Sequence, residues 1–284
     1  MNIDGRTQLI GLIGWPVSHS FSPAMHNAAL AALGLNWIYV PLPVHPANIA
    51  GALRGLPALG FRGVNVTVPH KQAVMPFLHE ISPAARAIGA VNTILVDQEN
   101  GRLSGSNTDW RGFLADLAAL EVELDGRACL VLGAGGSARG IVYGLNQAQG
   151  RVVIMARRVE QARQLAADMG EESVQTIRPL EQLGEVAAEL NAPLIINTTP
   201  LGMSPNFEGS PWPDEVPIPA GSFVYDLVYN PIETRLMRQA AAAGCRTSNG
   251  LGMLLRQGAA SLSLWTGLEP DLAIMKEALE ASKG

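Results

Sequence analysis

The chain has 284 residues, of which 48% are hydrophobic and 16% are charged, and its formal net charge is −5. This length is enough for two α/β domains, each with its own core. Because the slightly acidic balance comes without a basic patch or tail, nucleic acids and anionic membranes are poor candidate partners, and we expect a small-molecule partner. Cys129 and Cys245 lie far apart and outside any C-x-x-C spacing, which argues against disulfides or a zinc thiolate site and favours a reducing cytoplasm.

Short β-rich runs alternate with helical stretches in the first hundred residues, which predicts βαβ units and a largely parallel sheet. We expect strands at residues 9–13, 37–40, 63–68 and 93–96, and a helix at 24–33. Asn100-Gly101 has the turn chemistry of a hairpin, so this domain is expected to carry one antiparallel edge. Ser22-Pro23 indicates a helix start, with the hydroxyl as cap and proline at the first helical position.

A second alternation begins at residues 129–132 and predicts a Rossmann-like unit. It continues with a glycine-rich turn, a helix to about residue 147, strands at 152–155, 194–197 and 223–226, and a charged helix from 159. Two closing helices, at 252–266 and 270–281, have no strand of their own, so we expect them to pack on the first domain. The expected fold is α/β with two lobes and a cleft between them, one lobe formed by residues 1–108 and 250–284 and the other by 109–249.

The segment from Gly133 to Ala138 fits G-x-G-x-x-A between a strand and a helix. Gly133 permits the tight turn, Gly135 lets the backbone approach a pyrophosphate, and Ala138 allows close packing of helix and strand. The pattern predicts a dinucleotide site, with a turn that serves only packing as the alternative.

The end of the next predicted strand bears on the choice of cofactor. An NAD-selective site normally offers a carboxylate there to the ribose 2′-hydroxyl, whereas this chain has Ala156-Arg157-Arg158. Two guanidinium groups favour a 2′-phosphate and therefore NADP. The alternative is that both arginines belong to a solvated helix start.

The stretch NVTVPHK, from Asn65 to Lys71, places a lysine one short turn beyond a predicted strand. Asn65 and Thr67 alternate with valines, so the strand is either half-buried or carries a polar row towards its C-terminal end. Asp109 follows a second polar cluster and precedes a helical pattern at 110–120. It is therefore either a helix N-cap or the acidic partner of Lys71 in an acid/base pair.

Seven segments, in this order along the chain, resemble the shikimate dehydrogenase family. They are SHSFSP at 18–23, NVTVPHK at 65–71, GAVNT at 89–93, NTD at 107–109, GAGGSARG at 133–140, DLVYNP at 226–231 and NGLGMLLRQ at 249–257. The resemblance implies an NADP-dependent oxidoreductase that reversibly reduces 3-dehydroshikimate to shikimate with NADPH, in the biosynthesis of chorismate and the aromatic amino acids. It makes the first lobe the substrate-binding domain and the second the NADP-binding domain.

The resemblance also implies the roles of individual residues, with Lys71 and Asp109 as the catalytic pair. The substrate-binding residues that it implies are Ser20, Ser22, Thr67, Lys71, Asn92, Asp109, Tyr229 and Gln257. The NADP(H)-binding residues that it implies are Gly133, Ala134, Gly135, Gly136, Ser137, Arg157, Arg158, Thr199, Leu227 and Gly250. Without the family, Ser22 is read as a helix cap, and the Gln257 amide is expected to bond a backbone carbonyl.

Two departures from the common family pattern are Ala156 before the two arginines and Trp110 after the aspartate. Trp110 either shapes the cleft wall or packs as a helix residue.

The alternative functions are an enzyme that acts on quinate or an aminoshikimate, and a non-catalytic ligand sensor. Retention of both Lys71 and Asp109 argues against the sensor. His19 and His26 lack a third ligand with metal spacing, so we expect no metal. His70 either tunes Lys71 or faces solvent. The choice between a monomer and a homodimer stays open.

Overall fold

The computed structural model describes residues 3–282, and the chain divides into two compact units. The first unit is formed by 1–112 and 254–284, and the second by 113–253. Helices α4 (Asp109–Ala119) and α9 (Leu251–Thr266) each begin in one unit and end in the other, so each division falls within a helix, four residues beyond the predicted lobe boundary. Residues 1–2 and 283–284 of the predicted first lobe lie outside the described residues.

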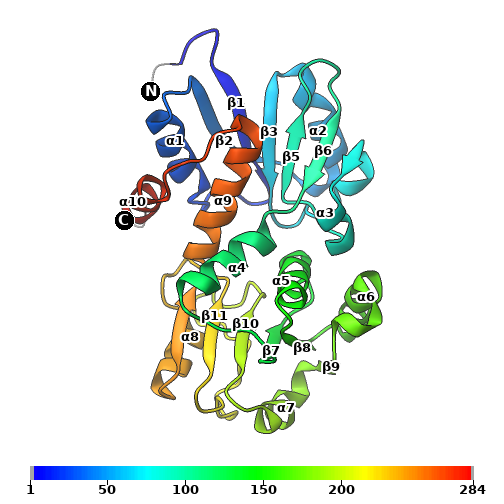
Figure 1. Cartoon of the computed structure of the whole chain (residues 1–284), viewed down its shortest axis with the longest axis vertical. Coiled ribbons are helices and arrows are strands. Elements are labelled where there is room, and N and C mark those ends of the chain that lie inside the picture. The colour runs from blue at the N-terminus through cyan, green and yellow to red at the C-terminus, as the bar shows by residue number, and fades with distance from the viewer. Residues whose placement is uncertain (1–2, 283–284) are drawn as a thin grey trace. The chain divides into compact units, whose positions relative to one another are not determined.

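The first unit contains a mostly parallel sheet in the order β2-β1-β3-β5-β6-β4 (Figure 1). Its strands are β1 (Gln8–Gly14), β2 (Trp37–Pro43), β3 (Phe61–Val66), β4 (Glu80–Ile81), β5 (Thr93–Val96) and β6 (Leu103–Ser106). β5 runs antiparallel to both β3 and β6, and Gly101, with φ of 71°, lies in the hairpin loop that joins β5 to β6. The hairpin is confirmed, but the predicted antiparallel edge is wrong, because β4 pairs with β6 and leaves β5 inside the sheet.

Helices cover both faces of this first sheet. They are α1 (Ser22–Ala32), α2 (Ile49–Ala58), α3 (Pro83–Ile88) and α10 (Leu272–Ala281), with part of α4 and of α9, and the 3-10 turns η1 (Pro46–Asn48) and η2 (Met75–Phe77). Leu53 of α2 packs with Val64 and Val66 on one face of β3. On the other face, Gly63 leaves room for Trp265 of α9, whose indole Nε1 donates to the Ile94 carbonyl at 3.0 Å. α9 therefore lies over the face that carries the polar residues of β3.

The start of α1 differs from the prediction. Its N-cap residue is Phe21, without a side-chain capping bond, and Ser22 is already the first helical residue. The Ser22 N–H donates to Ser20 Oγ at 3.3 Å, so the hydroxyl that caps this backbone group belongs to the residue two positions earlier. The prediction that Ser22 caps the helix with proline at the first position is therefore wrong by one residue.

The second unit contains a parallel sheet in the order β12-β11-β10-β7-β8-β9. Its strands are β7 (Ala128–Leu132), β8 (Arg151–Ala156), β9 (Thr176–Pro179), β10 (Leu194–Asn197), β11 (Phe223–Asp226) and β12 (Arg246–Asn249). Counted from β7, this is the 3-2-1-4-5-6 order of the doubly wound dinucleotide-binding fold, so the predicted Rossmann-like unit is confirmed. β9 and β12 were not predicted, because the short sequences TIRP and RTSN carry little hydrophobic pattern.

Helices α5 (Gly136–Gln147) and α6 (Val159–Met169) lie on one face of the second sheet, and α7 (Leu183–Glu189) and α8 (Arg235–Ala242) on the other. The 3-10 turns η3 (Glu171–Ser173) and η4 (Leu180–Gln182) complete the unit. Val131 and Ile154 pack towards α5, whereas Leu130 and Val153 pack towards α7, so both faces of the central strands are apolar. This burial on both faces explains the continuous apolar runs of β7 and β8.

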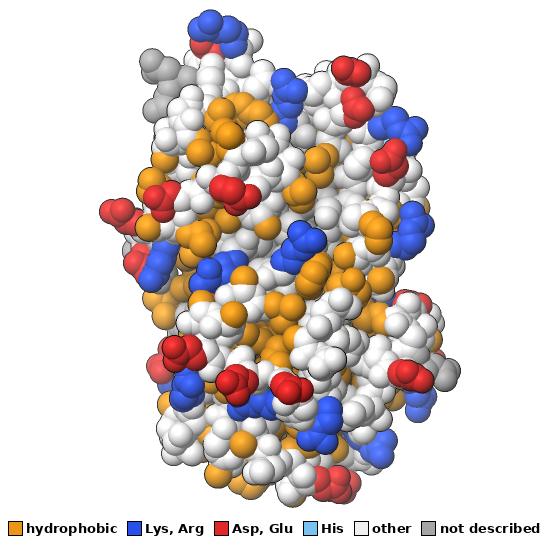
Figure 2. All heavy atoms as spheres, viewed as in Figure 1, with side chains coloured by type: hydrophobic (Ala, Val, Ile, Leu, Met, Phe, Trp, Pro, Cys, Tyr) orange, Lys and Arg blue, Asp and Glu red, His pale blue; other side chains and the backbone are white. Residues whose placement is uncertain are grey.

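Charged side chains are mixed over the face shown in Figure 2, where acidic and basic groups alternate rather than gather by sign. Within residues 3–282, no helix is long and apolar enough to cross a membrane. The same residues contain no group of three His, Cys, Asp or Glu side chains that could hold a metal ion.

Candidate active site

The turn after β3 places Lys71. The Thr67 N–H donates to the Ile13 carbonyl at 2.8 Å, and the His70 N–H donates to the Thr67 carbonyl at 2.9 Å. Val68 is 62% exposed, so the predicted strand to residue 68 is wrong by two residues. The His70 ring is buried, with Nε2 2.7 Å from the Val44 carbonyl. The solvent-facing reading of His70 is therefore wrong, and the ring anchors the turn just before Lys71.

Lys71 and Asp109 form an ion pair in the first unit. Lys71 Nζ donates to Asp109 Oδ2 at 2.7 Å, and the two side chains are only 11% and 5% exposed. Asp109 is the first residue of α4, and its own N–H donates to Asn107 Oδ1 at 3.0 Å. The N-cap reading of Asp109 is therefore wrong, and its carboxylate is used by side chains from other elements.

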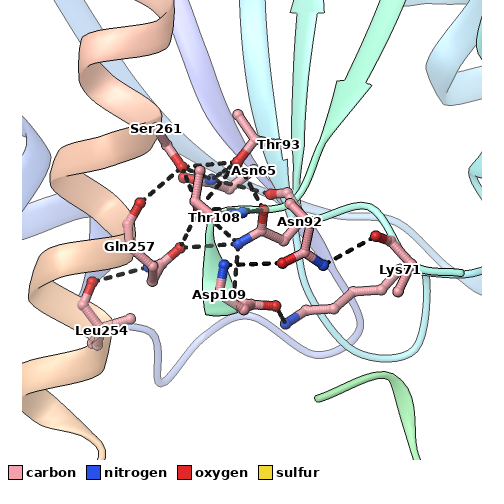
Figure 3. A network of polar contacts seen from close by, with 11 residues as sticks. Asn65, Lys71, Asn92, Thr93, Thr108, Asp109, Leu254, Gln257 and Ser261 are labelled. Atoms are coloured by element: carbon pink, nitrogen blue, oxygen red, sulfur yellow. Dashed lines mark hydrogen bonds and ion pairs between the residues drawn. The ribbon is translucent and has the colours of Figure 1, made fainter. Parts of the chain in front are cut away.

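Asn92, just before β5, connects the ion pair to its surroundings (Figure 3). Its Nδ2 donates to Asp109 Oδ1 at 2.8 Å and lies 2.9 Å from Thr108 Oγ1 and 3.2 Å from Gln257 Oε1. Its Oδ1 accepts from the Thr108 N–H at 2.8 Å. One carboxylate oxygen of Asp109 is thus held by Asn92 and the other by Lys71.

Gln257 reaches this group from α9. Its Nε2 donates to the Leu254 carbonyl at 2.9 Å, so the expected backbone partner is confirmed, while its Oε1 accepts from Asn92. Gly112 of α4 makes the approach feasible, because an added Cβ there would lie 2.7 Å from the Gln257 backbone nitrogen. A side chain at position 112 would push the two helices apart.

The remaining residues that the resemblance implies for the substrate lie elsewhere. Ser20 and Ser22 lie at the start of α1, and Thr67 is half-buried just beyond β3. Tyr229 is half-buried in the second unit, three residues beyond β11. The hydrogen bonds of Figure 3 join Lys71, Asn92, Asp109 and Gln257.

Sequence reasoning missed four members of this network, namely Asn65, Thr93, Thr108 and Ser261. Each is at most 5% exposed, although each carries a polar side chain. A signal was present for Ser261, since it follows Gln257 by one helical turn on the same stripe of α9.

The glycine turn of the second unit follows β7. Gly133 has φ of 109°, and an added Cβ would lie 2.7 Å from Thr198 Oγ1, so both the conformation and the space require glycine. Gly135 precedes the first residue of α5 and has no atom within 4 Å of its ideal Cβ position. Since Gly135 brings no side chain, the start of α5 has no side-chain cap, and such a helix start can accept an anion at its first N–H groups.

A buried pair of polar side chains holds the two loops beside this turn. Asn197 Oδ1 accepts from the Thr199 N–H at 2.9 Å, and Asn197 Nδ2 donates to Asp226 Oδ1 at 2.8 Å. Asp226 Oδ1 also accepts from the Val228 N–H at 3.0 Å. Burial raises the pKa of Asp226 to about 6, against the lowering effect of these hydrogen bonds. The loops with Thr199 and Leu227 are therefore tied to the ends of β10 and β11.

Arg157 and Arg158 are exposed where β8 ends, and Arg158 is the N-cap residue of α6. β8 is the neighbour of β7 in the sheet, so these guanidinium groups lie at the strand end where the adenosine ribose of a dinucleotide is recognised. Ala156 offers no carboxylate for a free 2′-hydroxyl. The open space at Gly135, the uncapped start of α5 and the two arginines fit NADP(H).

The fold and these residues define the chain as an α/β protein of the dinucleotide-dependent oxidoreductase class, with a Rossmann-like unit and a lysine–carboxylate pair in the other unit. Family models match three parts of the chain: the shikimate dehydrogenase substrate binding domain at residues 12–94, shikimate/quinate 5-dehydrogenase at 116–200, and the shikimate 5'-dehydrogenase C-terminal domain at 250–280.

Relatives cover the whole chain. It is 44% identical to the shikimate dehydrogenase (NADP(+)) of Carboxydothermus hydrogenoformans, over 99% of this chain and 100% of that one. A solved shikimate dehydrogenase in complex with NADP+ is 39% identical, with a TM-score of 0.90 over 100% of this chain and 98% of that one. The Thermus thermophilus enzyme in complex with NADP(H) and shikimate is 40% identical, with a TM-score of 0.86 over 97% of this chain and 99% of that one. The chain belongs to the shikimate dehydrogenase family.

Proposed function

We propose that this protein is an NADP-dependent shikimate dehydrogenase that reversibly reduces 3-dehydroshikimate to shikimate. The observation that carries the proposal is the Lys71–Asp109 pair, joined at 2.7 Å and nearly excluded from water, with Asn92 on the second carboxylate oxygen. Burying a lysine and an aspartate together costs free energy. A non-catalytic sensor has no need for such a desolvated pair.

The chemistry follows from the charges of this pair. The residues proposed for the second unit would hold NADPH, which when bound would supply a hydride for the ketone carbon. As the carbonyl oxygen becomes an alkoxide, the Lys71 ammonium stabilises the negative charge and donates its proton to that oxygen. The Asp109 carboxylate holds the ammonium in place and accepts a hydrogen bond from a substrate hydroxyl. In the reverse direction the neutral Lys71 amine takes the proton back from the alcohol.

The residues that bind shikimate are also proposals. Hydroxyl groups of Ser20, Ser22 and Tyr229 would donate to the substrate carboxylate. The ring hydroxyls would be bound by side chains that offer both donors and acceptors, namely Thr67, Lys71, Asn92, Asp109 and Gln257. The polar groups of the last four already share one hydrogen-bond network, which supports a common role.

The proposed NADP(H) site lies in the second unit. The glycine turn and the uncapped start of α5 would bind the pyrophosphate, the arginines the 2′-phosphate, and the remaining residues the nicotinamide end. These residues are Gly133, Ala134, Gly135, Gly136, Ser137, Arg157, Arg158, Thr199, Leu227 and Gly250. Gly250 is buried, and an added Cβ would lie 2.2 Å from the Leu227 carbonyl oxygen. Only glycine therefore fits where the backbone at position 250 approaches Leu227.

We further propose the domain division at residues 1–108 with 250–284 for substrate and 109–249 for NADP(H), and a cytoplasmic location. Two free, buried cysteines, Cys129 and Cys245, support a reducing compartment. A homodimer stays a prediction, which analytical ultracentrifugation of the purified chain tests.

A spectrophotometric assay tests the function. We expect reduction of NADP⁺ with shikimate, slower reduction of NAD⁺, and little turnover with quinate. Faster turnover with quinate would move the substrate to the quinate alternative within the same family. Absence of turnover with either alcohol, in a folded protein that binds NADP⁺, would overturn the enzyme proposal.

A further inference from the structure

Three buried polar side chains lie behind the Lys71–Asp109 pair without a role in the proposed chemistry. Asn65 of β3 is 5% exposed, and Thr93 of β5 and Ser261 of α9 are completely buried. We call these three residues the polar layer; Figure 3 shows them above Asn92 in that view. Burying a polar group costs free energy unless the group is hydrogen-bonded. The hydrogen-bond partners of the polar layer therefore show which group it orients.

The orientation of Asn65 starts the network. The Tyr39 hydroxyl donates to Asn65 Oδ1 at 2.8 Å. The Asn65 amide nitrogen therefore points into the polar layer, where it donates to the Asn92 carbonyl at 3.1 Å and to Ser261 Oγ at 2.9 Å. Ser261 thus accepts from Asn65 and keeps its single proton for another acceptor.

The hydroxyl protons can be followed in the same way. The Ser261 hydroxyl donates to the Gln257 carbonyl at 3.0 Å, and its oxygen lies 2.8 Å from Thr93 Oγ1. Thr93 Oγ1 accepts from the Asn65 amide nitrogen at 3.3 Å and donates to Asn92 Oδ1 at 2.9 Å. The chain of donors therefore runs from Asn65 through Thr93 to the Asn92 amide oxygen, and Ser261 contacts both Asn65 and Thr93.

This direction decides which way the Asn92 amide faces. Its Oδ1 accepts from the Thr93 hydroxyl, from the Thr108 N–H at 2.8 Å and from the Thr108 hydroxyl at 3.3 Å. A flipped amide would place its NH₂ group against the fixed Thr108 N–H and its oxygen against the Asp109 carboxylate, so both contacts would be repulsive, and the Thr93 hydroxyl would lose its acceptor. The NH₂ group must face Asp109 Oδ1.

We propose that Thr93 and Ser261 are positioning residues that lock the Asn92 amide towards Asp109 Oδ1 and so leave Asp109 Oδ2 to Lys71. Neither residue contacts Lys71 or Asp109 directly in the described network; both act through Asn92. The inference rests on the proposed function, because its main readout is turnover of shikimate.

The test is a double-mutant cycle between Thr93 and Asn92. Thr93→Val removes the hydroxyl and keeps the volume, whereas Thr93→Ser keeps the hydroxyl. We expect Thr93→Val to lower kcat about tenfold with the KM for shikimate within about twofold, as for loss of one hydrogen bond that orients the catalytic group, and Thr93→Ser to stay near the wild type. In an Asn92→Ala background, Thr93→Val should cause no further loss.

Ser261→Ala is the second variant and removes the hydroxyl that lies 2.8 Å from Thr93 Oγ1 and accepts from Asn65. We expect a loss in kcat of about threefold in the wild type and none in Thr93→Val, because Ser261 acts on Asn92 only through Thr93. This variant also keeps the proposal testable if Thr93→Val does not fold.

Three outcomes would overturn the proposal. They are an equal loss from Thr93→Val with and without Asn92, a failure of Thr93→Ser to restore kcat, and a loss of NADP⁺ binding in parallel with kcat, since that binding uses the second unit. A wild-type protein without dehydrogenase activity would instead overturn the proposed function. In that case the NMR signals of the Asn92 side-chain amide decide the positioning role: they should shift in Thr93→Val and not in Thr93→Ser.

Discussion

The two units offer opposite kinds of site to their proposed ligands. In the first unit, the proposed site consists of buried side chains whose hydrogen bonds are shared, and Lys71 and Asp109 are 11% and 5% exposed. In the second unit, the proposed site consists of a glycine turn with open space at Gly135 and of exposed arginines at the end of β8. Chemistry on a substrate carbon requires side-chain atoms held within fractions of an ångström, whereas a pyrophosphate is satisfied by backbone N–H groups.

This difference predicts how each unit should respond to mutation. In a buried network each polar atom depends on the others, so a lost atom affects the whole site. At a backbone site the side chains are independent, and their losses should add. The predictions below use this contrast, in order of decreasing effect.

Lys71→Ala should have the largest effect. We expect kcat to fall about 1,000-fold, within the range for loss of a general acid, with the KM for shikimate within a few-fold because Lys71 acts mainly in the transition state. Lys276→Ala, at an exposed position of α10, is the matched control and should keep normal kinetics. Near-normal turnover of Lys71→Ala would remove the lysine from the mechanism.

Replacing Arg157 and Arg158 together by alanine should weaken the use of NADP⁺ but not of NAD⁺. We expect the KM for NADP⁺ to rise about 100-fold, from the loss of charge-assisted hydrogen bonds, with the KM for NAD⁺ nearly unchanged. Arg163→Ala removes an exposed arginine of α6, the helix that follows these two residues, and should change neither constant. Equal losses for NADP⁺ and NAD⁺ would show that the arginines do not read the 2′-phosphate.

The pH dependence of stability should have opposite signs in the two units. Burial raises the pKa of Asp226, in the second unit, from 3.8 to about 6. Its stabilising contribution is therefore complete below about pH 4 and is lost as the pH rises through about 6, by about 2 kcal/mol between pH 4.5 and 6.5. Urea unfolding of wild type and Asp226→Asn over this range measures the difference, and a pH-independent difference would contradict the prediction.

His26 of the first unit supplies the opposite case. Its ring is completely buried and stacks on Tyr39 with centroids 4.1 Å apart, and burial lowers its pKa from 6.5 to about 4. Its contribution to stability is present above pH 6.5 and is lost as the pH falls towards 4. In urea unfolding, the stability advantage of wild type over His26→Phe should therefore shrink on acidification, whereas the advantage over Asp226→Asn should grow.

Gly135→Ala should have a smaller effect on NADP⁺ binding than the double arginine replacement. The added methyl meets no protein atom within 4 Å, so the melting temperature should stay unchanged. The methyl would instead occupy space needed by the pyrophosphate, and we expect the Kd for NADP⁺ to rise about tenfold, or about 1.4 kcal/mol. Gly184→Ala in α7, where a Cβ meets only Val216 at 3.5 Å, is the control. Unchanged affinity in Gly135→Ala would show that the ligand does not approach this glycine.

Much of the fold followed from local pattern. The strands at 194–197 and 223–226 have the predicted bounds, because continuous apolar runs between polar turns define a strand that is buried on both faces. The start of α1 and the end of β3 were wrong by one or two residues, since capping by Ser20 and the exposure of Val68 depend on neighbours that the local pattern does not include. His70 was ambiguous for the same reason, because its partner is a carbonyl 26 residues away.

The sequence by itself determined many of the helices and strands, the glycine turn after β7, and the two residues, Lys71 and Asp109, whose chemistry can move a proton. These features depend on neighbouring residues, whose preferences a linear pattern records. Only the tertiary structure decided that Asn65 and Ser261, 196 positions apart, share a hydrogen bond, and that Thr93 directs its proton to Asn92. The physical reason is that a buried polar atom needs a partner, and which partner it meets is set by how α9 packs on the sheet.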